Sequence, residues 1–239
     1  MVTFLKDRRK FRFLDDTTGK LVYDTAFRGP WTLTEWRLSN PEKQTNFVQI
    51  PGRDGAVDLY EGLTDGEPHY KPRTLTVKLT CSERDRKARL ELVDDIVNRL
   101  DGFTFRIVLP DDPTRYIRGV CSVAVDYNDL NHCGVIITAQ CDPWRVSMDY
   151  TTIDVEASAS QKTLILENRG RRRVIPYIAG YDAAPAMPNI SISSGTYSAT
   201  LTDYTGRYVS ELALGYQQTR ELTYSGSGHL TIGWREAIL

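Results

Sequence analysis

The run from Arg73 to Cys81 places the tightest constraint on the fold, because its side chains alternate strictly between apolar and polar. Successive side chains of a β-strand point to opposite faces, so this period of two predicts a strand with one buried face and one wet face. Such half-solvated strands are typical of antiparallel sheets. The apolar face comprises Leu75, Val77, Leu79 and Cys81, and the polar face comprises Thr74, Thr76, Lys78 and Thr80.

The segment that follows this strand has helical periodicity instead. Ser82 is expected to cap a helix over about 82–101, and the pair Asp101-Gly102 is expected to end it. Asp95 and Arg99 have the spacing of an ion pair on one helix face. An apolar stripe at helical spacing, which must cover one face of a sheet, consists of Leu90, Val93, Ile96, Val97 and Leu100.

Further strands are expected on both sides of this helix, with turn-rich pieces between them. Six or more strands and one helix predict an α+β domain over residues 1–145, and Asp142-Pro143-Trp144-Arg145 forms its exit. The predicted strands are Trp31–Leu38, Phe47–Ile50, Val57–Tyr60, Phe103–Leu109, Tyr116–Val125 and Cys133–Cys141.

Residues 146–161 are predicted to be a linker, because Thr151 to Ser160 is rich in Thr, Ser and Ala. Residues 162–239 then change to Gly, Ser, Thr and Tyr with short strands, which favours a C-terminal β-sandwich or jelly roll without a helix. The fold class is therefore mainly β. The expected strands are Thr163–Glu167, Arg173–Ile178, Asn189–Ile192, Tyr197–Leu201, Glu221–Tyr224 and Leu230–Trp234.

Charge and cysteine spacing argue against several kinds of site. Thirty Lys and Arg residues balance 31 Asp and Glu residues, whereas a duplex-binding domain concentrates positive charge on one face. The basic run Arg169 to Arg173 is interpreted as a solvated strand edge. Buried free thiols without a cofactor or metal are expected, because no CxxC spacing occurs among Cys81, Cys121, Cys133 and Cys141.

Neither a signal segment nor a stretch of transmembrane length is apparent, so folding in a reducing cytoplasm and no membrane contact are expected.

The chain has only His69, His132 and His229, and none lies in a G-x-S-x-G or related catalytic motif. We therefore predict no catalytic residue and no enzyme. A hydrolase that uses two carboxylates stays open as a minor hypothesis, since Asp and Glu are plentiful. Thirteen tyrosines keep a carbohydrate-binding adhesin open as well.

One candidate site is a tight turn between two predicted strands. Its proline and paired glycines mark the turn, and it has two possible roles. The residues either shape a hairpin or contact a neighbouring subunit. They are Ile50, Pro51, Gly52, Arg53, Asp54 and Gly55.

Several motifs occur in an order that resembles the distal tail proteins of siphophages, the long-tailed bacteriophages. In the first half these are the run Val48 to Gly55, then Asp58-Leu59, then Arg73-Thr74-Leu75 leading into the Ser82 helix. In the second half they are Asn168-Arg169-Gly170, a strand with Pro176, Gly226-Ser227-Gly228, and a closing strand before Arg235-Glu236-Ala237. The resemblance spans nearly the whole chain.

This resemblance implies a structural hub at the tip of a phage tail. The N-terminal domain would be a β-sandwich with one helix, and the C-terminal domain would be a galectin-like β-sandwich at the periphery. Six copies of the N-terminal domain would form a hexameric ring between the tail tube and the tip or baseplate. The implied partners are the tail tube protein, a tail-associated tip or lysin protein, and receptor-binding proteins that attach the phage to its host. DNA would pass through the lumen of the ring without specific binding. The implied location is the virion tail tip, assembled in the host bacterial cytoplasm.

Overall fold

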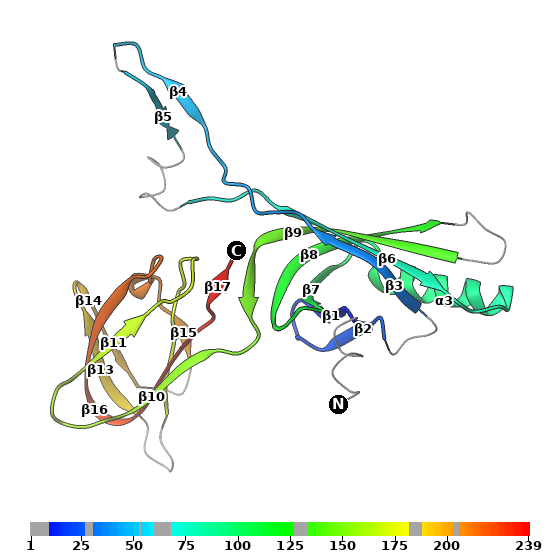
Figure 1. Ribbon diagram of the computed structural model, residues 1–239. Coiled ribbons are helices and arrows are strands. Elements are labelled where there is room, and N and C mark those ends of the chain that lie inside the picture. The colour runs from blue at the N-terminus through cyan, green and yellow to red at the C-terminus, as the bar shows by residue number, and fades with distance from the viewer. Residues whose placement is uncertain are drawn as a thin grey trace. The chain divides into compact units, whose positions relative to one another are not determined.

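The computed structural model describes residues 10–26, 31–52, 54–59, 68–126, 133–181, 188–202 and 206–239. The chain divides into two compact units, one of residues 1–145 with Leu239 and one of residues 146–238. Both units are built mainly from β-strands, and the first carries an α-helix (Figure 1). The prediction of a mainly β protein with a helix in its N-terminal part is confirmed.

An antiparallel sheet forms the first unit, with the strands in the order β2-β1-β7-β8-β9-β6-β3. The alternation predicted for β6 is confirmed, since every second residue from Arg73 is buried. Strand β6 pairs with β9 without a bulge, from Arg73 opposite Cys141 to Cys81 opposite Cys133. The bounds are β1 Arg12–Asp15, β2 Leu21–Asp24, β3 Trp31–Leu38, β6 Arg73–Cys81, β7 Thr104–Leu109, β8 Asp112–Asp126 and β9 Cys133–Ser147.

Helix α3 spans Arg86–Leu100, four residues shorter at its start than the predicted 82–101. Asp85 is its N-cap in place of Ser82, because the backbone of Asp85 is extended and its Oδ2 accepts the amide hydrogen of Ala88 at 2.9 Å. The predicted Asp95–Arg99 pair is present at 2.6 Å. Leu90 is an exception to the predicted stripe, since 41% of it is exposed. The helix packs on β8 and β2 with its buried residues Arg89, Val93, Ile96 and Leu100.

Strand β16, Thr219–Trp234, organises the second unit. Its first half pairs with β11 and β13, and its second half pairs with β10 and β12, so one strand belongs to two sheet regions. The other strands are β10 Thr151–Ala157, β11 Lys162–Glu167, β12 Tyr177–Tyr181, β13 Asn189–Ser194, β14 Tyr197–Leu201, β15 Arg207–Tyr208 and β17 Ala237–Ile238. A short 3-10 helix, η1, occupies Ser210–Leu212.

Three predictions for this unit are wrong in detail. The run Thr151–Ser160 is not part of a linker over 146–161, because β10 pairs with β16 over its whole length. Glu221–Tyr224 and Leu230–Trp234 are one strand rather than two. Gly226 lies inside it at a φ of 131°, a conformation that only glycine adopts without strain, and so bends the strand without ending it. Strand β12 begins at Tyr177 rather than Arg173.

Each unit has its own hydrophobic core. In the first unit, the core lies between the sheet and α3 and includes all four cysteines. The largest fully buried side chains of the second core include Leu166 and Ile178, which come from different strands. No helix in the described part of the chain is long and apolar enough to cross a membrane.

Candidate functional site

The predicted turn residues lie at the tip of a β-hairpin formed by β4, Phe47–Gln49, and β5, Ala56–Asp58. Gly52 and Gly55 have φ angles of 84° and 80°, which other residues rarely adopt, and both face open space. These two glycines therefore shape the turn through their backbone conformation. Arg53 lies outside the described residues. The remaining turn residues, Ile50, Pro51, Gly52, Asp54 and Gly55, are all exposed.

The β4–β5 hairpin stands at the end of an arm that extends from strands β3 and β6, and the described residues of this arm are 39–52, 54–59 and 68–72 (Figure 1). Backbone hydrogen bonds continue between the two sides of this arm. The amide of Lys71 donates to the carbonyl of Glu42 at 2.8 Å, and the amide of Gln44 donates to the carbonyl of His69 at 2.7 Å. Lys71 Nζ also lies 3.2 Å from the Glu42 carboxylate. The arm therefore has regular pairing although it lies beyond the main sheet.

The hairpin exposes apolar side chains. Phe47 is 65% exposed, and Val48, Ile50 and Leu59 are 39 to 42% exposed. Within the described ranges, no third strand pairs with β4 or β5. A two-stranded hairpin is marginally stable by itself in water, and its free edges can pair with another chain. This combination is typical of a segment that is covered in an assembly.

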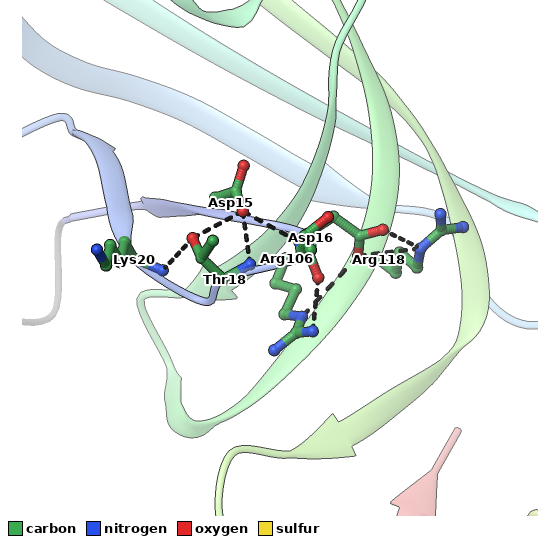
Figure 2. A network of polar contacts seen from close by, with 7 residues as sticks. Asp15, Asp16, Thr18, Lys20, Arg106 and Arg118 are labelled. Atoms are coloured by element: carbon green, nitrogen blue, oxygen red, sulfur yellow. Dashed lines mark hydrogen bonds and ion pairs between the residues drawn. The ribbon is translucent and has the colours of Figure 1, made fainter.

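A second feature is a polar network on the first unit (Figure 2). Arg118 Nε donates to both carboxylate oxygens of Asp16, at 3.0 and 2.9 Å, and Arg106 Nη2 donates to the Asp16 carbonyl at 2.5 Å. Backbone and hydroxyl hydrogen bonds from Thr18 hold the pKa of Asp15 below its ordinary value. The network fastens the turn between β1 and β2 to β7 and β8, which is a structural role.

A cluster of tyrosines occupies one face of the second unit. Tyr177 pairs with Gly233 on β16 and with Tyr208 on β15, and directly paired residues share a face. Tyr150 joins them through its hydroxyl, 3.3 Å from that of Tyr208, and Arg235 Cζ lies 4.3 Å from the Tyr150 ring centre. Tyr208 is 62% exposed and Tyr150 is 45% exposed. Exposed rings of this kind can stack on an apolar sugar face.

The motif Asn168-Arg169-Gly170 has a structural role that its sequence does not reveal. Asn168 is fully buried, and its Nδ2 donates to the carbonyls of Arg172 at 2.8 Å and Gly215 at 2.9 Å, with a longer bond to Leu214. A Cβ on Gly170 would lie 2.9 Å from the backbone of Ala237, so only glycine fits there. Arg169 pairs with Glu167 at the surface.

The histidines and cysteines in the described part of the chain do not gather into a metal site. In the portions of the chain that are described, no three His, Cys, Asp or Glu side chains could hold a metal ion. His132 lies outside these portions, His69 belongs to the arm, and His229 lies on β16. All four cysteines are buried and free, as predicted.

Comparisons with known proteins agree with this architecture. Residues 30–136, which include the β4–β5 hairpin, match the family model of the phage tail protein RIFT-related domain. The fold of this chain is similar to the crystal structure of Dit from phage SPP1, with a TM-score of 0.62 at 16% sequence identity. SPP1 Dit is described as a paradigm of the hub adsorption apparatus in phages that infect Gram-positive bacteria. The similarity covers 96% of this chain and 99% of SPP1 Dit.

A chain of the phage P2 baseplate in its activated conformation with Ca is matched over 95% of this chain and 98% of its own length. Its TM-score of 0.45 at 9% identity is too low to support an argument. No curated protein matches the sequence. The predicted resemblance to siphophage distal tail proteins is confirmed by the matched domain and the fold.

Proposed function

We propose that this chain, which carries the phage tail RIFT-related domain over residues 30–136, is the hub of a siphophage tail tip. Six copies would close into a ring between the tail tube and the tip or baseplate proteins. The observation that carries this proposal is the β4–β5 hairpin, with its free edges and exposed Phe47 and Val48. Closed cyclic symmetry covers such surfaces without open-ended association.

The same proposal places the protein in the virion tail tip, after assembly in the host cytoplasm, with DNA passing through the ring. A formal net charge of -1 supports this passage, because a strongly positive lumen would hold the DNA backbone. The tail tube protein would bind one side of the ring and a tip or lysin protein the other, with receptor-binding proteins around it. The hub would have no catalytic role. A carboxylate-dependent cell-wall hydrolysis by the purified chain would contradict this part.

The decisive measurement is the mass of the purified chain by light scattering, combined with negative-stain microscopy, with and without its tail partners. We expect hexameric rings, which can require neighbours to close. Phe47→Ser should prevent them, and Ile165→Ser is the matched control, because both residues are 65% exposed and Ile165 lies in the other unit. A strict monomer at every concentration, without rings beside its partners, would overturn the proposal.

A second candidate function, carbohydrate binding during host attachment, is favoured by the tyrosine cluster of the second unit. We infer it from the exposed rings of Tyr150 and Tyr208 beside the Arg235 guanidinium. A galectin-like topology of this unit would be compatible with such a site. A glycan array should show saturable binding that Tyr150→Ala removes and Tyr216→Ala retains, since these two tyrosines are 45% and 46% exposed. Absence of saturable binding would eliminate this candidate.

A further inference from the structure

One face of the strands β10, β16, β12 and β15 is turned away from the core of the second unit. Ile232 and Trp234 of β16 are buried in that core. Gly233 lies between them in the sequence, so it belongs to the opposite face, which we call the outer face. There Gly233 is paired with Thr152 of β10 on one side and with Tyr177 of β12 on the other. The tyrosine cluster therefore lies on the outer face.

Two glycines hold the rings of this cluster in place. Gly233 is buried although it lies on the outer face, and the position of a Cβ there would be 3.7 Å from Tyr150 Cδ1. A Cβ on Gly206 would overlap the hydroxyl and the ring of Tyr177. The Tyr177 ring in turn lies 5.3 Å from that of Tyr208, centre to centre, at an interplanar angle of 63°. Rings that are positioned before binding lose little freedom when a ligand arrives.

Arg235 supplies the charge of the cluster. Its Cζ lies 4.3 Å from the centre of the Tyr150 ring. The hydrogen bond between the hydroxyl groups of Tyr150 and Tyr208 raises the pKa of Tyr208 above its ordinary value, so Tyr208 is a neutral phenol at neutral pH. Among the described residues, the positive charge that acts on Tyr208 is that of Arg235, and no carboxylate acts on it. The aromatic end of the outer face is therefore positive.

The carboxylates of the outer face lie farther along the strands. Asp154 is paired with Thr231, and its Oδ1 accepts a hydrogen bond from the Thr231 hydroxyl at 2.5 Å. It is two residues beyond Thr152 on β10, a distance of about 7 Å along a strand. Glu156 follows two residues later and is exposed. The outer face thus has an aromatic, positive end and an acidic end.

We propose that the outer face binds a saccharide that carries a negatively charged group, with a sugar ring over Tyr150 and Tyr208 and the charged group at Arg235. The C–H side of a sugar ring is apolar and can pack on an exposed aromatic ring. A guanidinium group presents N–H donors in a planar fork that matches the oxygens of a carboxylate or a phosphate. The inference rests on the carbohydrate-binding function proposed above and names the class of its ligand.

The acidic end of the outer face would fix the direction in which this saccharide lies. The Asp154 carboxylate repels a negative group and accepts hydrogen bonds from hydroxyl groups. A saccharide with its charged group at Arg235 and uncharged, hydroxyl-bearing rings toward Asp154 satisfies both ends. The reverse direction would place two negative groups together.

The test is a glycan array probed with the full chain, on which hexose oligomers are displayed in neutral, phosphorylated and uronic acid forms. A charged form should bind saturably and at least about tenfold more tightly than the neutral oligomer of the same length, the difference expected for one charge-assisted hydrogen bond. Preference for the phosphate or the uronic acid form identifies the charged group. Equal binding of the neutral forms would overturn this inference and leave carbohydrate binding standing, whereas absence of saturable binding would eliminate both.

Variants assign the preference to one side chain. Arg235→Gln should weaken binding of the charged saccharide by about tenfold and leave binding of the neutral one unchanged. The control is Arg173→Gln, which removes the same charge from an exposed position of the same unit. Equal losses in the two variants would reveal a general effect of net charge and overturn the inference.

Arg235→Lys separates the charge of Arg235 from its packing on Tyr150. It retains the positive charge without the planar fork, so its affinity for the charged saccharide should lie between those of the parent chain and Arg235→Gln. If Arg235→Lys binds no better than Arg235→Gln, the side chain acts by packing on the ring and the inference is wrong.

Discussion

The side chain of Asp58 accepts a hydrogen bond from the backbone amide of Asn46 at 3.0 Å, and this contact closes the base of the β4–β5 hairpin. The amide of Leu59 returns a bond to the Asn46 carbonyl at 2.9 Å, and Lys43 Nζ lies 3.9 Å from Asp58. Asp58 is 8% exposed, whereas the apolar residues of the hairpin point into solvent. Polar contacts at the base therefore hold the hairpin in register in the absence of an apolar core.

We expect Asp58→Ala to loosen the hairpin while leaving the main sheet intact. The substitution leaves the Asn46 amide without its acceptor, which costs about 1–2 kcal/mol of local stability. Hydrogen–deuterium exchange should become faster over residues 43–59 and stay unchanged in β6. Asp54→Ala, at the exposed tip of the same hairpin, is the control and should exchange as the parent chain does.

Asn168→Ala should destabilise the second unit by about 2–4 kcal/mol, because several buried carbonyls lose their donor at once. The Gly170 amide also loses its acceptor, Asn168 Oδ1, at 3.0 Å. Urea unfolding followed by exchange in β11 and β16 measures the loss. Asn189→Ala, at an exposed position of β13, should cost less than about 0.5 kcal/mol. Equal effects of the two substitutions would argue against a role for the buried amide.

Local periodicity accounts for what the sequence predicted well. The alternation in β6 and the apolar spacing of α3 are properties of one segment, and the structure has both elements. Strand β10 lacked such a signal, because it owes its strand conformation to pairing with β16 over seven residue pairs. Strand β1 was also missed within a charged start, although Phe13 in this strand and Phe11 just before it are fully buried.

Sites made by residues far apart in sequence could not be predicted. Asp16 and Arg118, for example, are 102 positions apart in the sequence and meet only because the β1–β2 turn lies beside β8 in the folded sheet. The turn from Ile50 to Gly55 could be identified from the sequence, because glycine and proline mark turns through their own backbone preferences. What the sequence could not reveal is that this turn ends an arm with exposed apolar residues, because their exposure depends on which strands of the folded chain pair with the hairpin, and none of the described ones does.

The stability that Asp112 contributes should disappear at acid pH. Burial alone would raise the pKa of the Asp112 carboxyl. Hydrogen bonds from Thr114 and Arg115 and the positive charges of Arg115 and Arg145 lower the pKa by more, so it lies below the ordinary 3.8. A lowered pKa means that folding favours the charged form, so the contribution is present above about pH 4 and is lost as the pH falls through the folded pKa.

Urea unfolding of the parent chain and of Asp112→Asn from neutral to acid pH checks this expectation. The parent should be the more stable at neutral pH, and the difference should close below about pH 4. Asp111→Asn, at the exposed neighbouring position, should show no such convergence. A difference that persists to the lowest pH would mean that the two side chains differ for a reason other than charge.

The buried thiols should resist modification as long as the first unit is folded. Burial raises the pKa of both Cys121 and Cys141 to about 12, from an ordinary value of 9.0. Only the thiolate reacts, so at pH 8 these two residues should react about a thousandfold more slowly than free cysteine even before access is considered. A raised thiol pKa also stabilises the fold below about pH 9, and this contribution is lost as the pH rises toward 12.

Labelling with a thiol-reactive disulfide reagent at pH 8, followed by mass spectrometry, measures these rates. All four cysteines should react after unfolding in urea, whereas Cys121 and Cys141 should stay unmodified in the folded chain. Gly119→Ala is expected to expose them, because its Cβ would lie 2.7 Å from the Cys141 Sγ and must displace it. Rapid labelling of either residue in the folded parent chain would show that the core around β8 and β9 opens far more often than its burial implies.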